Sequence, residues 1–201
     1  MGKYILVIVI GYIMGNFASS YFVGKLLANI DIREHGSGNA GAANTFRVLG
    51  ATAGAIVFVC DVLKGILATA IGLWITGSRA GAMLAGGMAV IGHNWPVFFR
   101  FKGGKGIAAS FGLIIVLFPK IALILFAAVV PLMLITRYVS LGSITAAVLL
   151  PVLLVAYQEP PNIVLIGILL AVLAIFRHKD NLVRLWEGTE NKISFKNRSG
   201  R

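Results

Sequence analysis

Long apolar stretches, separated by short polar or glycine-rich ones, run through the whole chain. A transmembrane helix needs about 20 mostly apolar residues, and seven stretches approach or reach that length. Turn-forming residues stand between them, as Gly77, Pro119 and Pro160 illustrate. The pattern predicts an all-α integral membrane protein with about seven transmembrane helices in one bundle. The predicted segments are 4–27, 49–76, 80–98, 107–118, 121–136, 139–157 and 162–176, of which the fourth, fifth and seventh are short.

Composition supports a membrane protein and excludes several soluble classes. Of the 201 residues, 58% are hydrophobic and 12% charged, whereas soluble domains average roughly 45–50% apolar and about 25% charged residues. A soluble enzyme or a disordered chain is therefore not expected. The single cysteine, Cys60, allows no internal disulfide. Residues 1–190 are predicted to form one domain, and 191–201 a basic, flexible cytoplasmic tail.

The distribution of cations predicts the orientation. With seven spans, fourteen of the eighteen Lys and Arg residues lie on one side, and only Lys3, Arg79 and Lys120 on the other. Because cytoplasmic loops carry an excess of Lys and Arg, the N-terminus is expected outside and the C-terminus in the cytoplasm. This topology and anionic lipid of the bilayer account for the net charge of +11. No nucleic-acid partner is expected, since no basic face with stacking aromatics is visible.

The first polar stretch, 35–47, is rich in glycine and lies at a predicted cytoplasmic end. Small residues allow backbone N–H groups to converge on an anion, and Asn and Arg side chains add donors. A dinucleotide-binding loop is excluded, because no strand precedes the stretch. A tight loop with small residues for helix packing is the alternative. Ser37 is a candidate catalytic residue, and the candidate substrate-binding residues are Gly36, Gly38, Asn39, Gly41, Asn44 and Arg47.

The second polar stretch, 92–106, places Lys105 among glycines directly before a predicted helix. Glycines and a lysine at a helix N-terminus are typical of a phosphate site. A Walker A loop is excluded, because Phe99 stands where glycine is required and Gly106 where Ser or Thr is. A lone histidine such as His93 is more often a hydrogen-bonded structural residue than a base. Lys105 is a candidate catalytic residue, and the candidate binding residues are His93, Lys102, Gly103 and Gly104.

Three further features carry polar groups at or inside the apolar segments. His178 and Asn181 are three residues apart, so a helix would place them on one face; a basic cluster at the membrane edge is the alternative. Ser143 is a candidate ligand, but a serine in a membrane helix often bonds its own backbone. Asp61 and Lys64, one helical turn apart, are expected to neutralise each other or to face a polar cavity.

Together these features describe a site for phosphorylated substrates without a metal or another cofactor. The chain has no H-E-x-x-H, G-x-S-x-G or carboxylate cluster, and no histidine is followed by Asp five positions on. A transporter for a small anion or an organic phosphate is the competing class. The chain lacks paired inverted halves, however, and its glycine-rich stretches fall on one predicted face.

In residues 36–47, 61–65, 92–106 and 177–190, the chain resembles the bacterial acyl-phosphate:glycerol-3-phosphate acyltransferases, the PlsY family. The match covers nearly the whole chain in order and spacing. Ala43 and Ala109 depart from the family pattern, which usually has Thr at both positions. Ala43 lies inside the first glycine-rich stretch, so one hydroxyl donor is missing there.

The resemblance implies a seven-helix enzyme of the inner membrane with its active site on the cytoplasmic side. Such an enzyme transfers a fatty acyl group from acyl phosphate to the 1-hydroxyl of sn-glycerol 3-phosphate, and gives lysophosphatidic acid and phosphate. We assign one phosphate to the nest 37–44 with Arg47, and the other to Lys105 and His178. Asn181 and Ser143 would orient the substrates. His178 or a substrate phosphate oxygen would accept the hydroxyl proton. The oligomeric state stays open, a monomer included.

Overall fold

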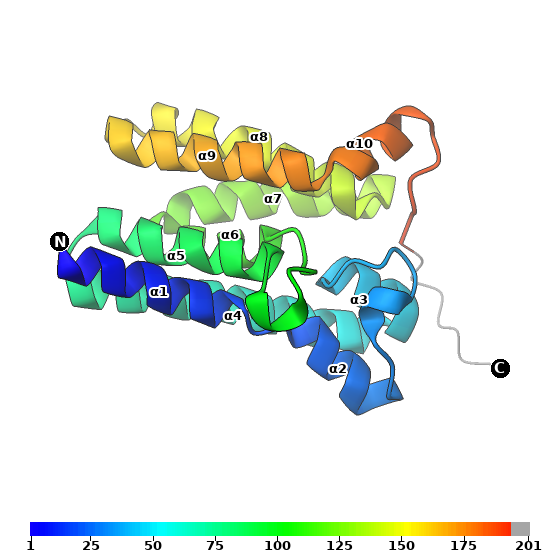
Figure 1. Cartoon of the computed structure of the whole chain (residues 1–201). Helices are drawn as coiled ribbons and strands as arrows, with labels where there is room; N and C mark the ends of the chain where they lie inside the picture. Colours follow the sequence, from blue (N-terminus) through cyan, green and yellow to red (C-terminus); the bar gives the residue numbers. More distant parts are fainter. Residues whose placement is uncertain (194–201) are drawn as a thin grey trace. The chain divides into compact units, whose positions relative to one another are not determined.

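The computed structural model describes residues 1–193, and all regular structure within this range is helical (Figure 1). The chain divides into two compact units, Met1–Val116 and Leu117–Ile193, which are described separately below. A single domain over 1–190 stays a prediction. Of the predicted flexible tail, residues 194–201 lie outside the described residues.

The first unit contains six helices and two short 3-10 turns. Each turn comes shortly before a run of glycines, and a helix follows that run. Gly50, with φ +88°, separates the third helix from the fourth, since glycine enters this conformation without steric cost. The helices are α1 (Gly2–Gly15), α2 (Ser19–Ala28), α3 (Ala42–Leu49), α4 (Ala51–Thr76), α5 (Arg79–Asn94) and α6 (Ile107–Leu117), and the turns are η1 (Ile32–Glu34) and η2 (Val97–Phe99).

Small residues bring α1, α4 and α5 into close contact (Figure 1). A Cβ on Gly11 would clash with the carbonyl oxygen of Ala85, and one on Gly15 with that of Ala89. These glycines stand four residues apart on one face of α1, the small-xxx-small pattern that lets membrane helices approach backbone to backbone. The contact fixes the end of α5 from which the second glycine-rich loop departs.

The same device joins α4 to α6. A Cβ on Gly65 would clash with the carbonyl oxygen of Ala109, and one on Gly112 with that of Val62. Ala109, one of the two departures from the family pattern, is fully buried in this contact. The start of α6, and with it the end of the second glycine-rich loop, is therefore held against α4.

The second unit is a row of three long helices followed by a short one. Helix α8 packs against both α7 and α9. Helices α9 and α10 meet at His178 with a bend of 59°. The helices are α7 (Pro119–Thr136), α8 (Val139–Ala156), α9 (Pro161–Arg177) and α10 (Lys179–Trp186).

Four stretches are long and apolar enough to cross a membrane, and a fifth qualifies if α9 and α10 count as one bent span. Each of the seven predicted segments contains a helix, but α5 has 16 residues and α6 only 11. The all-helical membrane fold is thus observed, while seven spans and the orientation of the termini stay predictions. The four stretches are Gly2–Ala28, Ala51–Thr76, Pro119–Thr136 and Val139–Ala156.

One predicted boundary was wrong: the third segment ends at Asn94 instead of residue 98. The first segment, 4–27, lies within the candidate span Gly2–Ala28, in which residues 16–18 separate α1 from α2. Proline at position 96 disfavours helical conformation in the residue before it, which explains the early end of α5. The first glycine-rich stretch continues from Ala42 as helix α3.

Candidate functional site

The first glycine-rich loop is closed from inside by one asparagine side chain. The Oδ1 atom of Asn44, on α3, accepts hydrogen bonds from the backbone N–H of Ser37 at 2.8 Å and from its hydroxyl at 3.1 Å. The Asn44 amide donates to the carbonyl oxygens of Ile32 and His35 at 3.1 and 2.9 Å. A side chain at Gly36 would clash with Asn44. Asn44, predicted to bind substrate, here uses its amide to shape the loop.

The other predicted residues of this stretch surround that closure. Gly36 and Gly38 adopt φ of +61° and +70°, which favours glycine. Gly41 directly precedes α3, and Asn39 lies beside it, since its Oδ1 stands 3.0 Å from where a Gly41 Cβ would be. Arg47 is half-buried on α3. The positive-φ glycines are therefore a requirement of the loop shape.

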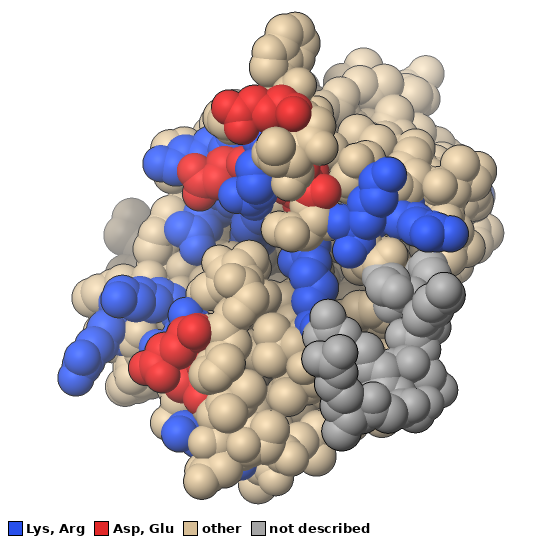
Figure 2. All heavy atoms as spheres, turned by 90° about the vertical axis from the view of Figure 1, so that its right-hand side faces the viewer, with Lys and Arg blue, Asp and Glu red and all other residues tan. Residues whose placement is uncertain are grey.

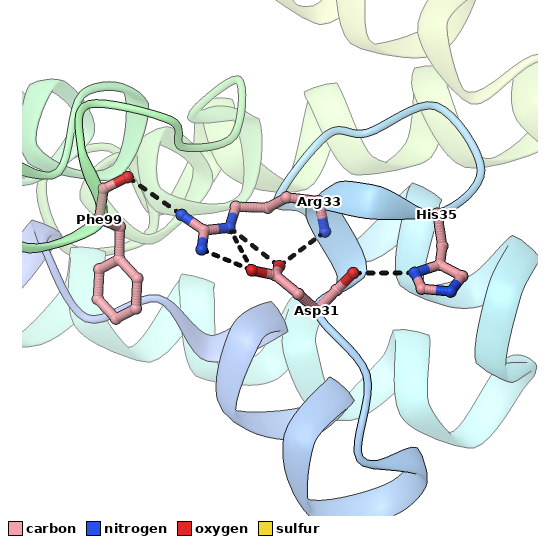
Figure 3. Close-up of polar contacts among 4 residues, drawn as sticks. All are labelled: Asp31, Arg33, His35 and Phe99. Carbon is pink, nitrogen blue, oxygen red and sulfur yellow. Dashed lines mark hydrogen bonds and ion pairs between the residues drawn. The ribbon is translucent and has the colours of Figure 1, made fainter.

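An arginine that sequence reasoning counted only as a cation ties the first loop to the second (Figure 3). The Arg33 guanidinium pairs with Asp31 at 2.6 Å and donates to the carbonyl oxygen of Phe99 at 3.1 Å. It also lies 5.3 Å from the ring centre of Tyr21 and 5.6 Å from that of Phe99. The hydrogen bond from Arg33 holds the pKa of the Asp31 carboxyl below its usual value. In the sequence, the only sign of this ion pair was the spacing of Asp31 and Arg33, two residues apart.

The second glycine-rich loop packs against the end of α5. The N–H of Gly104 donates to the carbonyl oxygen of His93 at 3.1 Å. A Cβ on Gly103 would clash with that carbonyl, and one on Gly104 with the His93 ring. Lys105 is half-buried and Lys102 exposed, and α6 begins two residues after Lys105. The glycines therefore have a packing reason, and the loop also ends at a helix N-terminus, where anions bind favourably.

A buried charged network underlies this loop. The Nζ atom of Lys64 lies 2.8 Å from Asp61 Oδ1, 2.7 Å from His93 Nδ1 and 2.9 Å from the carbonyl oxygen of Phe17. Ser19 donates a hydrogen bond of 2.5 Å to Asp61. Sequence reasoning placed His93 among the binding residues and did not connect it to Asp61 and Lys64. It also missed Ser19, although a polar residue inside an apolar stretch was a signal.

In the second unit, Glu190 accepts hydrogen bonds from three side chains on two helices, α8 and α10. Its carboxylate accepts hydrogen bonds from Ser140 at 3.0 Å, from Asn181 at 2.8 Å and from Arg184 at 2.8 Å. Burial raises the pKa of the Glu190 carboxyl, but the bonds from Asn181, Arg184 and Ser140 outweigh burial and hold the pKa below its usual value. Asn181 is therefore fixed by a carboxylate that our sequence analysis left out of the site.

His178 stands at the corner between α9 and α10 and is 3% exposed. Its Nδ1 atom lies 2.7 Å from the carbonyl oxygen of Ala174. Since a carbonyl only accepts, Nδ1 carries the proton and Nε2 is the basic nitrogen of the neutral ring. Asn181 follows one turn later and is also buried. Ser143, by contrast, donates to the carbonyl oxygen of Val139 at 2.9 Å, the local bond that its alternative interpretation predicts.

The predicted site residues therefore fall into two sets, each within one unit. The first unit holds the residues up to Lys105, with His93 joined to Asp61 and Lys64. The second unit holds Ser143, His178 and Asn181. In the view of Figure 2, several exposed Lys and Arg side chains lie near a few Asp and Glu side chains. Exposed cations attract anionic ligands.

Comparisons with known proteins agree with this chemistry. The family model for glycerol-3-phosphate acyltransferase matches residues 5–188. The glycerol-3-phosphate acyltransferase of Thermoanaerobacter sp. (strain X514) is 47% identical over 192 residues, 96% of either chain. That of Clostridioides difficile (strain 630) is 40% identical over 199 residues, 96% of this chain and 97% of the relative.

Solved structures give the same result. The crystal structure of PlsY (YgiH), an integral membrane glycerol 3-phosphate acyltransferase, in its glycerol 3-phosphate form matches with a TM-score of 0.90 and 36% identity, over 96% of each chain. The lysophosphatidic acid form matches with a TM-score of 0.88 and 35% identity, over 96% of this chain and 97% of the other. The likeness covers both units of the present structure.

Proposed function

The chain belongs to the glycerol-3-phosphate acyltransferase family, and from this premise we propose that it transfers a fatty acyl group from acyl phosphate to the sn-1 hydroxyl of glycerol 3-phosphate. The products are lysophosphatidic acid and inorganic phosphate. The observation that carries the proposal is the pair of glycine-rich loops in the first unit, each packed against one buried residue, Asn44 and His93.

Acyl phosphate as the donor suits a site built from loops and cations. The glycerol hydroxyl oxygen attacks the acyl carbonyl carbon, the bond from that carbon to the phosphate oxygen breaks, and its electron pair leaves with phosphate. Because phosphate is already a stable anion, the reaction needs little acid assistance. Two phosphates must be held despite their repulsion, so positioning and fixed positive charge supply most of the acceleration.

The roles follow from chemistry and placement. The nest 37–44 with Arg47 binds one phosphate, and Lys105 with Gly103 and Gly104 binds the other. Lys102, exposed beside these glycines, adds positive charge. No metal or other cofactor takes part. Ser37 contributes its N–H and hydroxyl to the first loop.

His178 is the proposed acceptor of the hydroxyl proton. Its Nδ1 is bonded to the Ala174 carbonyl, so Nε2 has the lone pair that a base needs. Asn181, fixed by Glu190, orients a substrate. A phosphate oxygen of the substrate is the alternative base. If His178→Gln keeps near-wild-type turnover in folded protein, the phosphate oxygen is the base.

The membrane placement completes the proposal. The protein spans the inner membrane seven times with its N-terminus outside, and the reaction takes place on the cytoplasmic side. The exposed apolar faces of the long helices, including Leu67 and Trp74 on α4, support contact with lipid. The excess of cations in the segments assigned to the cytoplasm supports the orientation.

The test is phosphate release by purified protein in detergent, with palmitoyl phosphate, with and without glycerol 3-phosphate, and with no added metal. We expect release that depends on glycerol 3-phosphate and is accompanied by lysophosphatidic acid. Lys105→Ala should lower turnover by about 100-fold, since it removes a charge at the transferring group. Detergent excludes transport as the source of the signal, because a transporter needs a sealed vesicle.

Lys120→Ala is the matched control, because Lys120 is exposed at the start of α7 in the other unit. Its turnover should equal that of the wild type. Equal losses in the two variants would contradict the role of Lys105. Turnover with acyl coenzyme A but not with palmitoyl phosphate would contradict the proposed donor.

A further inference from the structure

The buried network of Asp61, Lys64 and His93 contains more than an ion pair, because it also includes a histidine ring. Asp61 is 1% exposed, Lys64 5% and His93 7%. A protonated lysine has three N–H donors and no acceptor. Lys64 has three acceptors within 2.9 Å, namely the Asp61 carboxylate, the Phe17 carbonyl and His93 Nδ1. Each donor of the ammonium therefore has one acceptor.

This arrangement determines the state of the His93 ring. Two charged groups face Nδ1 of His93, the Lys64 ammonium at 2.7 Å and Asp61 Oδ1 at 3.5 Å. Because the nearer ammonium can only donate, Nδ1 accepts from it, and the ring is neutral with its proton on Nε2. A proton on Nδ1 could reach Asp61 only at the longer distance and would place an N–H against the ammonium. Asp61 neutralises Lys64 through their ion pair, and Ser19 keeps the Asp61 carboxylate in place.

The other edge of the ring meets the second glycine-rich loop. A Cβ on Gly104 would clash with His93 Nε2 and would stand 2.8 Å from the carbonyl oxygen of Ala40. The His93 Nε2–H therefore faces the backbone of Gly104 and the end of the first loop. The carbonyl of His93 already accepts from the Gly104 N–H. One residue thus holds the backbone just before Lys105 through both its ring and its main chain.

We propose that Asp61 and Lys64 fix His93 in the tautomer protonated on Nε2, and that His93 is thereby a positioning residue that keeps the 103–105 backbone in its phosphate-binding shape. This inference rests on the proposed function. It makes His93 a support for the phosphate site instead of a ligand or a base. The charged pair inside α4 then has a consequence for substrate affinity, exerted through a neighbouring helix.

The first test reads the tautomer directly by 15N NMR of protein labelled at histidine, in detergent at neutral pH. The chain has three histidines, and the signals absent from His93→Gln identify His93. We expect the wild type to have a protonated Nε2 and an unprotonated Nδ1. In the double variant Asp61→Asn/Lys64→Met, which removes both charges together, we expect this single tautomer to be lost. A protonated Nδ1 in the wild type would overturn the proposal.

The second test compares two amides at position 93. Glutamine places an N–H group near the position of Nε2, whereas asparagine is too short to reach it. We expect His93→Asn to raise KM for the phosphate substrate bound by Lys105 about tenfold, with a smaller change in kcat. We expect the KM of His93→Gln to stay close to that of the wild type. Equal KM values in the two variants would count against the proposal.

Thr69→Val is the matched control. Thr69 is fully buried on α4, and its hydroxyl donates to the Gly65 carbonyl at 2.7 Å, so the change removes a buried polar group that has no part in the network. The control should keep the wild-type tautomer and KM. Binding of inorganic phosphate, measured by calorimetry, repeats the comparison without turnover. If the wild type has no acyltransferase activity, the proposed function fails, while the NMR and phosphate binding still decide the inference.

Discussion

Each unit of the molecule has a buried charged side chain with three hydrogen-bonding partners, but the two sites are built in opposite ways. In the first unit the centre is a cation, Lys64, which donates to Asp61, His93 and a main-chain carbonyl. In the second unit the centre is an anion, Glu190, which accepts from three side chains. Full satisfaction of hydrogen bonds is what makes either charge tolerable away from water.

The two sites differ in where the opposite charge comes from. Asp61 is one helical turn from Lys64 on α4, so this helix carries both members of its ion pair, while Phe17 and His93 come from other segments. Glu190 lies after α10 and takes its donors from α10 and from Ser140, fifty residues earlier on α8. The ion pair of the first site therefore belongs to one helix, whereas Glu190 holds α8, α10 and the segment after α10 together.

The largest effect is expected from removing the buried cation. Lys64→Met leaves the Asp61 carboxylate buried without its counter-charge, and should lower the free energy of unfolding by about 4 kcal/mol. The double variant Asp61→Asn/Lys64→Met should recover at least half of this loss, because no charge stays buried. Thermal unfolding in detergent measures both. Equal unfolding temperatures for the single and double variants would mean that the pair is not coupled.

Removing the buried anion should have a somewhat smaller effect. Glu190→Ala leaves donors on Ser140 and Asn181 without their acceptor, and we expect a loss of about 3 kcal/mol. Since Arg184 is partly exposed, water can replace its bond. Glu190→Gln keeps one acceptor oxygen and should lose less. Unfolding measured alongside turnover would detect a different outcome, in which Glu190→Ala is as stable as the wild type and only activity falls.

The pH dependence of stability sharpens the comparison further. The lowered pKa of Glu190 means that its carboxylate stabilises the folded state above the usual glutamate pKa, about 4.3. That stability is lost as pH falls through the lower, folded-state pKa. Asp31, whose pKa is also lowered, acts in the same direction in the first unit. Unfolding of Glu190→Gln between pH 3 and pH 7 should vary less with pH than that of the wild type. An unchanged slope would show that Glu190 does not carry the pH dependence.

The smallest effect is expected at the link between the two loops. Arg33→Lys keeps the charge but loses the paired geometry with Asp31 and the stacking on Phe99, because a lysine ammonium is compact. We expect a loss of about 1 kcal/mol, typical of a partly exposed pair. Hydrogen exchange of the backbone amides at 99–104 should become faster, whereas Lys25→Ala on exposed α2 should leave them unchanged.

Much of this structure could be predicted from the sequence, because the helices and their boundaries depend on residues close together in the chain. Apolar runs predicted a helix in every segment, and the spacing of Asp61 and Lys64 placed both on one face. Glycines around Lys105 correctly marked a loop before a helix that starts at residue 107. The broken first segment was not predictable in this way, because residues 16–18 interrupt an apolar run without proline or glycine.

What sequence reasoning could not provide was the pairing of distant polar groups. Nothing local shows that His93 receives its hydrogen bond from Lys64, or that Glu190 receives three. Asn44 looked like a donor for substrate, yet its amide shapes a loop. These pairings depend on helix packing, in which glycines such as Gly11 decide which faces meet. The number of membrane spans stays a prediction, because α5 and α6 are shorter than a typical transmembrane helix.

The position of Glu190 in the chain also determines when its site can form during biosynthesis. Because it follows every described helix, it is the last member of its site to leave the ribosome. Until then the shared acceptor of Ser140, Asn181 and Arg184 is missing. The helices of the second unit can insert before that point, but the hydrogen bonds that hold α8 to α10 cannot form. The first unit has its lysine and aspartate on one helix and completes that pair as soon as α4 forms. The first unit can therefore form its buried ion pair early in synthesis, and the second forms its site only after Glu190 has emerged.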